Sequence, residues 1–228
     1  MGLNDILQSA VGGISMGLTY GLIGLGVVFL WQSINRINFA NISSAMLSAY
    51  LFYTFYSQLH FGFILSALLA LLLVALYGLL LRYFIYEPIT RKGGGRLEFV
   101  IATLMICVFW LCVINAIYGG LPKPFPPVFG EASQFVQLGI VSLPSVYFWI
   151  FLVAAILIGF LHILLRKTLI GKMLRATAQN KEAAALMGIN VNFTTSLAFV
   201  LSTTLVGIAG ILLAPIYFVS LELGGGSI

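Results

Sequence analysis

Long apolar runs separated by short polar segments make up most of the chain. A helix that crosses a bilayer needs roughly 20 mostly apolar residues, and most of the runs have about that length. We predict six spans, near residues 6–30, 41–57, 62–85, 98–118, 145–165 and 193–218. The second run is short and polar for a span, which favours a broken or half-length helix. The pattern therefore predicts an all-α, polytopic membrane helix bundle, with one transmembrane domain over residues 1–228.

Composition supports this class. Hydrophobic residues make up 61% of the chain and charged residues only 7%, with a mean hydropathy of +1.10. Soluble domains are about 25% charged, so this composition excludes a soluble globular protein.

Basic residues gather on one side of the predicted six-span topology. Ten of the 11 Lys and Arg residues fall there: Arg36, Arg82, Arg91, Lys92, Arg96, Arg166, Lys167, Lys172, Arg175 and Lys181. Only Lys123 falls on the other side. By the positive-inside rule the crowded side is cytoplasmic. The N-terminus and the Pro-rich loop near residues 119–144 are then expected outside, and the loop near residues 166–192 inside.

The inner loop 166–192 contains a polar, Ala-rich stretch, "GKMLRATAQNKEAAALMGIN". We predict a short helix in it, with Asn180 as the N-cap, Glu182 in the first turn and Gly188 at the end. A helix this short is marginal in water, so it needs something to pack on. From these residues alone, it is either a connector that lies on its own spans or a docking element for a soluble partner.

Two further stripes bear on packing and transport. Asn38, Asn41, Ser44 and Ser48 share one face of the second run. Such a polar face either bonds neighbouring helices or lines a pathway, where Asn41 would cap a half-helix whose N-terminus attracts a substrate carboxylate. Along the first run, three glycines are spaced at i, i+4 and i+8, which predicts close helix packing at these positions. These are Gly13, Gly17 and Gly21. The alternative is that a glycine here opens the transport path.

No centre for catalytic chemistry is evident in the sequence. His60 and His162 have no carboxylate or Cys beside them, and Cys107 and Cys112 point in different directions on a helix. We therefore expect no catalytic residue, no metal and no cofactor. The acidic residues all fall at loops or run ends, which disfavours a proton- or sodium-coupled carrier.

Several blocks, in order, resemble the branched-chain amino acid ABC permease family, in its smaller permease type. They are "GGISMGLTYGLIGLGVVFLW", "INRINFANISSAMLSAYL", "LRYFIYEPITR" with "LEFVIATLMI", "TLIGKMLRATAQNKEAAALMGINV" and "LAFVLSTTLVGIAGILLAPIYF". The inner loop also resembles the coupling loop of ABC importers, and the matching or neighbouring residues are Arg175, Lys181, Glu182, Ala183, Ala184 and Gly188.

The resemblance implies a permease subunit of an ATP-driven importer for amino acids or similar small polar solutes, in the bacterial inner membrane. It implies a second homologous permease, two separate ATPase subunits that use the ATP, an external solute-binding protein and surrounding lipid, but no nucleic acid. The chain departs from the family pattern at Asn41, Ile42 and Ser43, and it ends before the family's last spans, which indicates a fragment. The alternatives are an ATP-independent channel or secondary transporter and, less favoured, a membrane enzyme.

Overall fold

Helices account for almost all of the described chain. The computed structural model describes residues 3–121, 123, 135–138 and 141–217. The α-helices are α1 (Leu3–Ile34), α2 (Ala40–Tyr53), α3 (Phe63–Leu81), α4 (Glu87–Arg91), α5 (Arg96–Tyr118), α6 (Ser145–Lys167), α7 (Leu169–Gln179), α8 (Lys181–Leu186) and α9 (Val191–Tyr217). Two π-helical segments, η1 (Thr54–Gln58) and η2 (Arg82–Tyr86), extend α2 and α3. The apolar runs become helices because a helix satisfies its backbone polar groups internally, which lipid does not do.

Five of the described helices are long and apolar enough to cross a membrane. They contain or match five of the six predicted spans, and the predicted all-α membrane bundle is confirmed. The remaining one, near 41–57, is α2 with η1, and α2 has only 14 residues. Because η1 continues α2 directly, the helix runs unbroken from Ala40 to Gln58, and the expectation of a broken or half-length second element is wrong.

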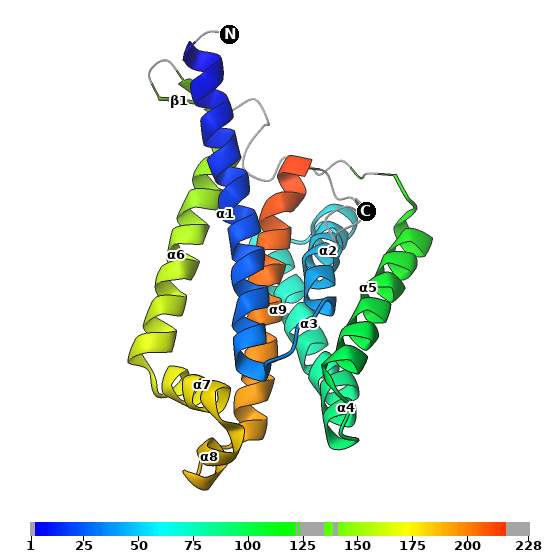
Figure 1. Ribbon diagram of the computed structural model, residues 1–228. Coiled ribbons are helices and arrows are strands. Elements are labelled where there is room, and N and C mark those ends of the chain that lie inside the picture. The colour runs from blue at the N-terminus through cyan, green and yellow to red at the C-terminus, as the bar shows by residue number, and fades with distance from the viewer. Residues whose placement is uncertain (1–2, 122, 124–134, 139–140, 218–228) are drawn as a thin grey trace.

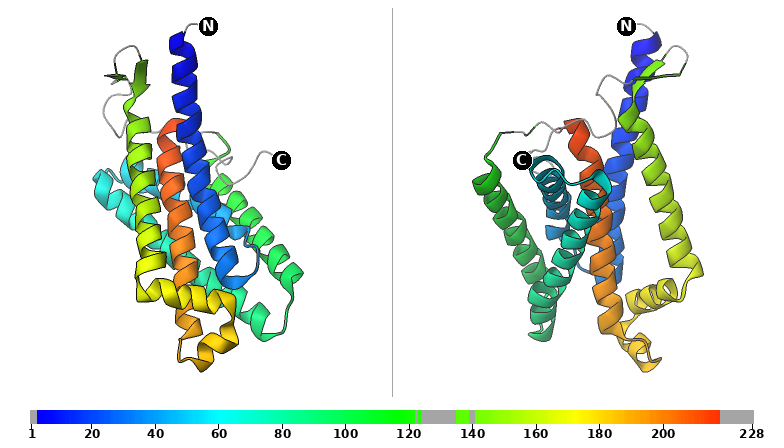
Figure 2. Two further views of the ribbon diagram at one scale, coloured as in Figure 1. Left: turned by 60° about the vertical axis from the view of Figure 1, so that its left-hand side comes forward. Right: turned by 180° about the vertical axis from the view of Figure 1, so that it is seen from behind.

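Helix α9 forms the centre of the bundle, with α1, α2 and α3 packed around it (Figure 1). In the most apolar 18-residue stretch of α9, 72% of residues are buried, against 17% in α5. Figure 2 shows α5 and α6 on opposite outer sides of this core. The two outer helices therefore present most of their apolar surface outward.

The two ends of the bundle differ. Helices α4, α7 and α8 lie together at the end where α1 finishes and α9 begins, opposite the N-terminus (Figure 1). A small antiparallel hairpin, β1 (Phe135–Leu138) with β2 (Val141–Pro144), lies near the other end. The sequence pattern predicted neither this hairpin nor α7 as a separate helix, since it treated both segments as loops.

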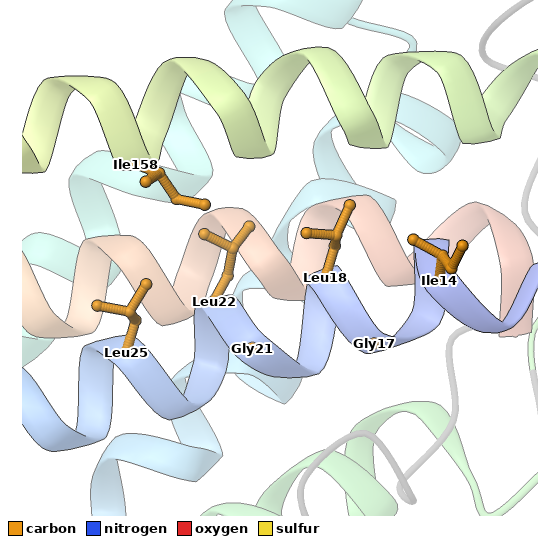
Figure 3. Close-up of a pocket in the computed structure, with 7 residues that line it drawn as sticks. All are labelled: Ile14, Gly17, Leu18, Gly21, Leu22, Leu25 and Ile158. Atoms are coloured by element: carbon orange, nitrogen blue, oxygen red, sulfur yellow. The ribbon is translucent and has the colours of Figure 1, made fainter. Parts of the chain in front are cut away.

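The close helix contacts predicted at Gly13, Gly17 and Gly21 are absent from the part of the chain that the structure describes. All three glycines are exposed, and a Cβ added at any of them would meet nothing within 4 Å. Gly17 and Gly21 instead line an open apolar groove between α1 and α6, where Leu18 and Leu22 point towards α6 (Figure 3).

Other glycines make the close helix contacts. A Cβ at Gly26 of α1 would lie 2.6 Å from Val206 of α9, and one at Gly210 of α9 would meet the Ala45 carbonyl of α2. The small residues that bring backbones together therefore face α9, at the centre of the bundle.

Candidate coupling loop and substrate pathway

The loop after α6 folds back because Thr168 caps the next helix. The Thr168 hydroxyl accepts a hydrogen bond from the Gly171 backbone N–H at 3.1 Å and donates to the Leu164 carbonyl at 2.6 Å. Gly171 is buried, and a Cβ there would meet the Leu164 and Leu165 carbonyls. These contacts hold α7 against the end of α6, and Arg175 is left on its exposed side.

Helix α8 has the two ends that the sequence predicts. The Asn180 side-chain oxygen accepts from the N–H groups of Glu182 and Ala183 at 2.9 and 3.0 Å. At the other end Gly188 has a φ of +82°, and the Ile189 N–H donates to the Ala184 carbonyl at 3.0 Å. This pair of features is a Schellman stop, which requires the left-handed backbone that glycine favours. The predicted N-cap and stop are confirmed.

The exposed face of α8 differs from the one that the Ala-rich stretch suggests. Ala184 is only 4% exposed and lies against the chain's own helices. Glu182 and Ala183 are exposed, but the most prominent side chains are Leu186, 88% exposed, and Met187, 83% exposed. The sequence analysis did not identify this apolar pair, although two large apolar residues directly before a glycine that ends a helix can indicate an exposed contact.

Lys181 is not the free rim charge that its sequence position suggests. Its Nζ donates to the Tyr86 hydroxyl at 2.5 Å and lies 5.2 Å from the centre of the Tyr86 ring. Tyr86 is itself buried between Phe99 of α5 and Phe199 of α9. Lys181 therefore ties the start of α8 to the core through one aromatic side chain.

The polar stripe of α2 is buried among helices. Asn38, Asn41, Ser44 and Ser48 are each at most 3% exposed. Asn41 does not cap the helix, because α2 already begins at Ala40 and its N-cap residue makes no side-chain bond. Instead, the Asn41 amide donates to the Ser202 hydroxyl of α9 at 2.7 Å.

Members of the stripe differ in how their polar atoms are satisfied. The Ser48 hydroxyl donates to the carbonyl oxygens of Ala45 and Gly207, each at 2.8 Å. By contrast, the Ser44 hydroxyl, the Asn41 carbonyl oxygen and both amide atoms of Asn38 are buried without a hydrogen-bond partner among the described residues. An unsatisfied buried polar group costs about 1–3 kcal/mol, so these groups have capacity for a polar ligand or water.

Among the described residues, no group of three or more His, Cys, Asp or Glu side chains is placed to hold a metal ion. The fold and the arrangement of its ends define a multi-pass membrane protein, with a polar stripe inside the bundle and a capped helical loop outside it.

Comparison with known proteins identifies the class more closely. Residues 9–223 match the family described as branched-chain amino acid transport system, permease component. The chain belongs to this family, and is a membrane permease subunit of an ABC importer rather than an enzyme. The resemblance seen in the sequence blocks is therefore confirmed.

Three relatives show the extent of the similarity. The high-affinity branched-chain amino acid transport system permease protein LivH of Salmonella typhimurium is 27% identical over 224 residues, 92% of this chain and 71% of that protein. LivH of Escherichia coli K12 is 27% identical over 225 residues, with the same shares. The probable permease protein LivH of Methanocaldococcus jannaschii is 32% identical over 199 residues, 84% of this chain and 61% of that protein. No solved structure matches the chain.

Proposed function

We propose that this permease carries branched-chain amino acids into the cell, driven by ATP that separate subunits hydrolyse. The family match over residues 9–223 carries the proposal, since it includes the core helices as well as α7 and α8. The relatives are branched-chain amino acid transport permeases by name. The test is uptake of labelled leucine by proteoliposomes that hold the full transporter. Uptake that continues without ATP would instead favour a channel or a secondary carrier.

The importer class requires ATPase and substrate-binding partners. We propose the set that the sequence resemblance implies: a second homologous permease, two ATPase subunits and an external solute-binding protein. Under this proposal the bundle is surrounded by lipid in the bacterial inner membrane. The open apolar faces of α5 and α6 fit contact with lipid or with the second permease, because the described residues leave both largely uncovered.

Helix α8 is our candidate for the contact with an ATPase subunit. Leu186 and Met187 are highly exposed at the end of α8, and α8 itself lies at the end of the bundle (Figure 1). Large exposed apolar side chains at such a place mark a protein contact, because they lie beyond the segments that lipid covers. Arg175, Glu182 and Ala183 are exposed on the same loop, where Arg175 and Glu182 add charged groups.

We infer that the end bearing α8 is cytoplasmic, because the basic residues gather there. Single cysteines at Leu121 and Met187 test this orientation, in a background without Cys107 and Cys112. Both positions are exposed, at 78% and 83%. In intact cells we expect a membrane-impermeant maleimide to label only Leu121→Cys, and permeabilised cells to label both. The reverse pattern would contradict the orientation.

The polar stripe of α2 is our candidate for the pathway. Ser44 and Ser48 lie one turn apart and form a matched pair, since Ser44 has no hydrogen bond and Ser48 bonds α9. We expect Ser44→Ala to lower leucine uptake with no loss of thermal stability. We expect Ser48→Ala to lower stability by about 0.6 kcal/mol, up to about 1.7, the range for hydrogen bonds between membrane helices. Normal uptake by Ser44→Ala would remove Ser44 from the pathway.

A further inference from the structure

Three basic side chains surround a polar cavity at the end of the bundle that carries α8. Arg36 follows α1, Arg96 begins α5 and Lys181 begins α8. The cavity has a volume of about 540 Å³, and hydroxyl and amide side chains such as Thr90 and Gln179 also line it. Its position at the ends of membrane spans is the level of the lipid headgroups.

None of these three cations forms an ion pair with a carboxylate among the described residues. The Arg36 Nη2 donates to the Gly94 carbonyl at 2.9 Å, while its Nη1 is buried and has no partner. The Arg36 guanidinium lies 5.7 Å from the centre of the Tyr86 ring, and Lys181 bonds the Tyr86 hydroxyl rather than a carboxylate. Arg36 and Lys181 are partly buried, and withdrawing a charge from water is costly unless an opposite charge compensates it. The cavity is therefore suited to an anion.

The lining residues carry three positive charges and one negative charge, from Glu182, which gives a net charge of +2. The carboxylate of Glu98 also lies close to Gly95, another lining residue. This balance favours a phosphate that carries a net negative charge. It disfavours a zwitterionic headgroup, whose own cation would meet the same basic side chains.

We propose that this cavity binds the phosphate of an anionic phospholipid headgroup. Basic pockets between membrane helices bind such headgroups. Exposed apolar residues are neighbours of the basic lining residues in the sequence: Ile37 directly follows Arg36, and Leu97 and Ile101 follow Arg96 along α5. A lipid whose phosphate lies between the basic residues can lay its acyl chains along this face. A free phosphate makes no use of that surface, which favours the lipid as the source.

The lipid site goes beyond the proposed transport function and does not depend on which amino acid is carried. Because Lys181 begins α8 and lines the cavity, a bound headgroup would contact the same side chain that fixes α8 to Tyr86. The lipid would therefore help to hold the coupling loop at the membrane surface.

Native mass spectrometry of the complete transporter tests the proposal, with dioleoylphosphatidylglycerol and dioleoylphosphatidylcholine as probes. We expect the wild type to retain phosphatidylglycerol in preference to phosphatidylcholine. Arg36→Gln and Arg96→Gln should each weaken phosphatidylglycerol binding about five-fold, which corresponds to about 1 kcal/mol per basic residue at a membrane surface. Arg166→Gln is the matched control, because Arg166 lies at the same end of the bundle but outside the cavity lining.

Several outcomes would overturn the lipid assignment. One is phosphatidylglycerol binding at the wild-type level by both cavity variants. Another is an equal loss of phosphatidylglycerol binding in Arg166→Gln, because the binding would then depend only on the general surface charge. If inorganic phosphate binds as tightly as phosphatidylglycerol, the site takes a free anion. If the permease binds phosphatidylglycerol only after its ATPase subunits are removed from the transporter, the cavity is a protein contact. Arg96 is exposed, so Arg96→Gln keeps the test valid if Arg36→Gln fails to fold.

Discussion

Replacing Gly210 with alanine is expected to prevent α9 from packing on α2 and to abolish the accumulation of folded permease. A Cβ at Gly210 would meet the backbone carbonyl of Ala45 and lie 2.5 Å from the Ser48 hydroxyl. A carbonyl inside a helix cannot rotate away, so the two helices would have to separate along the most buried span. Overpacking costs about 1–3 kcal/mol where side chains can adjust, and we expect the loss here to exceed that range.

Gly17→Ala is the matched control for this prediction. Gly17 also lies within a long apolar helix, but a Cβ there meets nothing within 4 Å. Alanine is favoured over glycine inside a helix by roughly 0.5–1 kcal/mol, so this variant should be as stable as the wild type or slightly more so. Gel filtration with fluorescence detection, after heating, measures both variants. A wild-type profile for Gly210→Ala would show that the contact between α2 and α9 is not close.

The membrane spans and the short helix α8 could be predicted from the sequence because their signals are local. An apolar run of sufficient length has to become a helix in lipid, and Asn180 and Gly188 define helix ends by their own hydrogen bonding and backbone freedom. For this reason the predicted spans and both ends of α8 agree with the structure.

The direction in which each helix faces could not be predicted in the same way. Gly17 and Gly26 both occur in the glycine-rich α1, yet only Gly26 lies against α9. Likewise, nothing near Asn41 in the sequence indicates that its partner is Ser202 on the last described helix. Such pairings depend on the arrangement of the whole bundle, which one sequence does not encode in any short pattern.

The candidate coupling loop combines a feature that could be predicted with contacts that could not. Its helix was predicted, but two residues that resemble the coupling loop of ABC importers contact the bundle itself: Ala184 faces inward, and Lys181 bonds Tyr86. Bulk at Ala184 would therefore displace α8 from its own bundle before any partner was involved. The outward surface consists of Leu186 and Met187, so a test of docking belongs there.

The double variant Leu186→Ser, Met187→Ser is expected to uncouple the permease from its ATPase subunit. Both side chains are more than 80% exposed, at 88% and 83%, so their loss should change the stability of the permease by less than about 0.5 kcal/mol. If they are the apolar anchors of the contact, truncation should cost about 2 kcal/mol or more, which is roughly a 30-fold loss of affinity. Co-purification with the ATPase and ATP-driven leucine uptake should both fall, while membrane insertion persists.

Leu169→Ser separates docking from a general loss of apolar surface. Leu169 begins α7 in the same loop and is 75% exposed, but it lies at the end of α6 and not on α8. We expect this variant to retain the ATPase and to transport leucine at the wild-type rate.

Gly188→Val should act like the double variant, because a φ of +82° costs a β-branched residue about 1–2 kcal/mol and would misplace the apolar pair. Undiminished co-purification and uptake in the double variant would leave α8 as a connector that lies on its own spans.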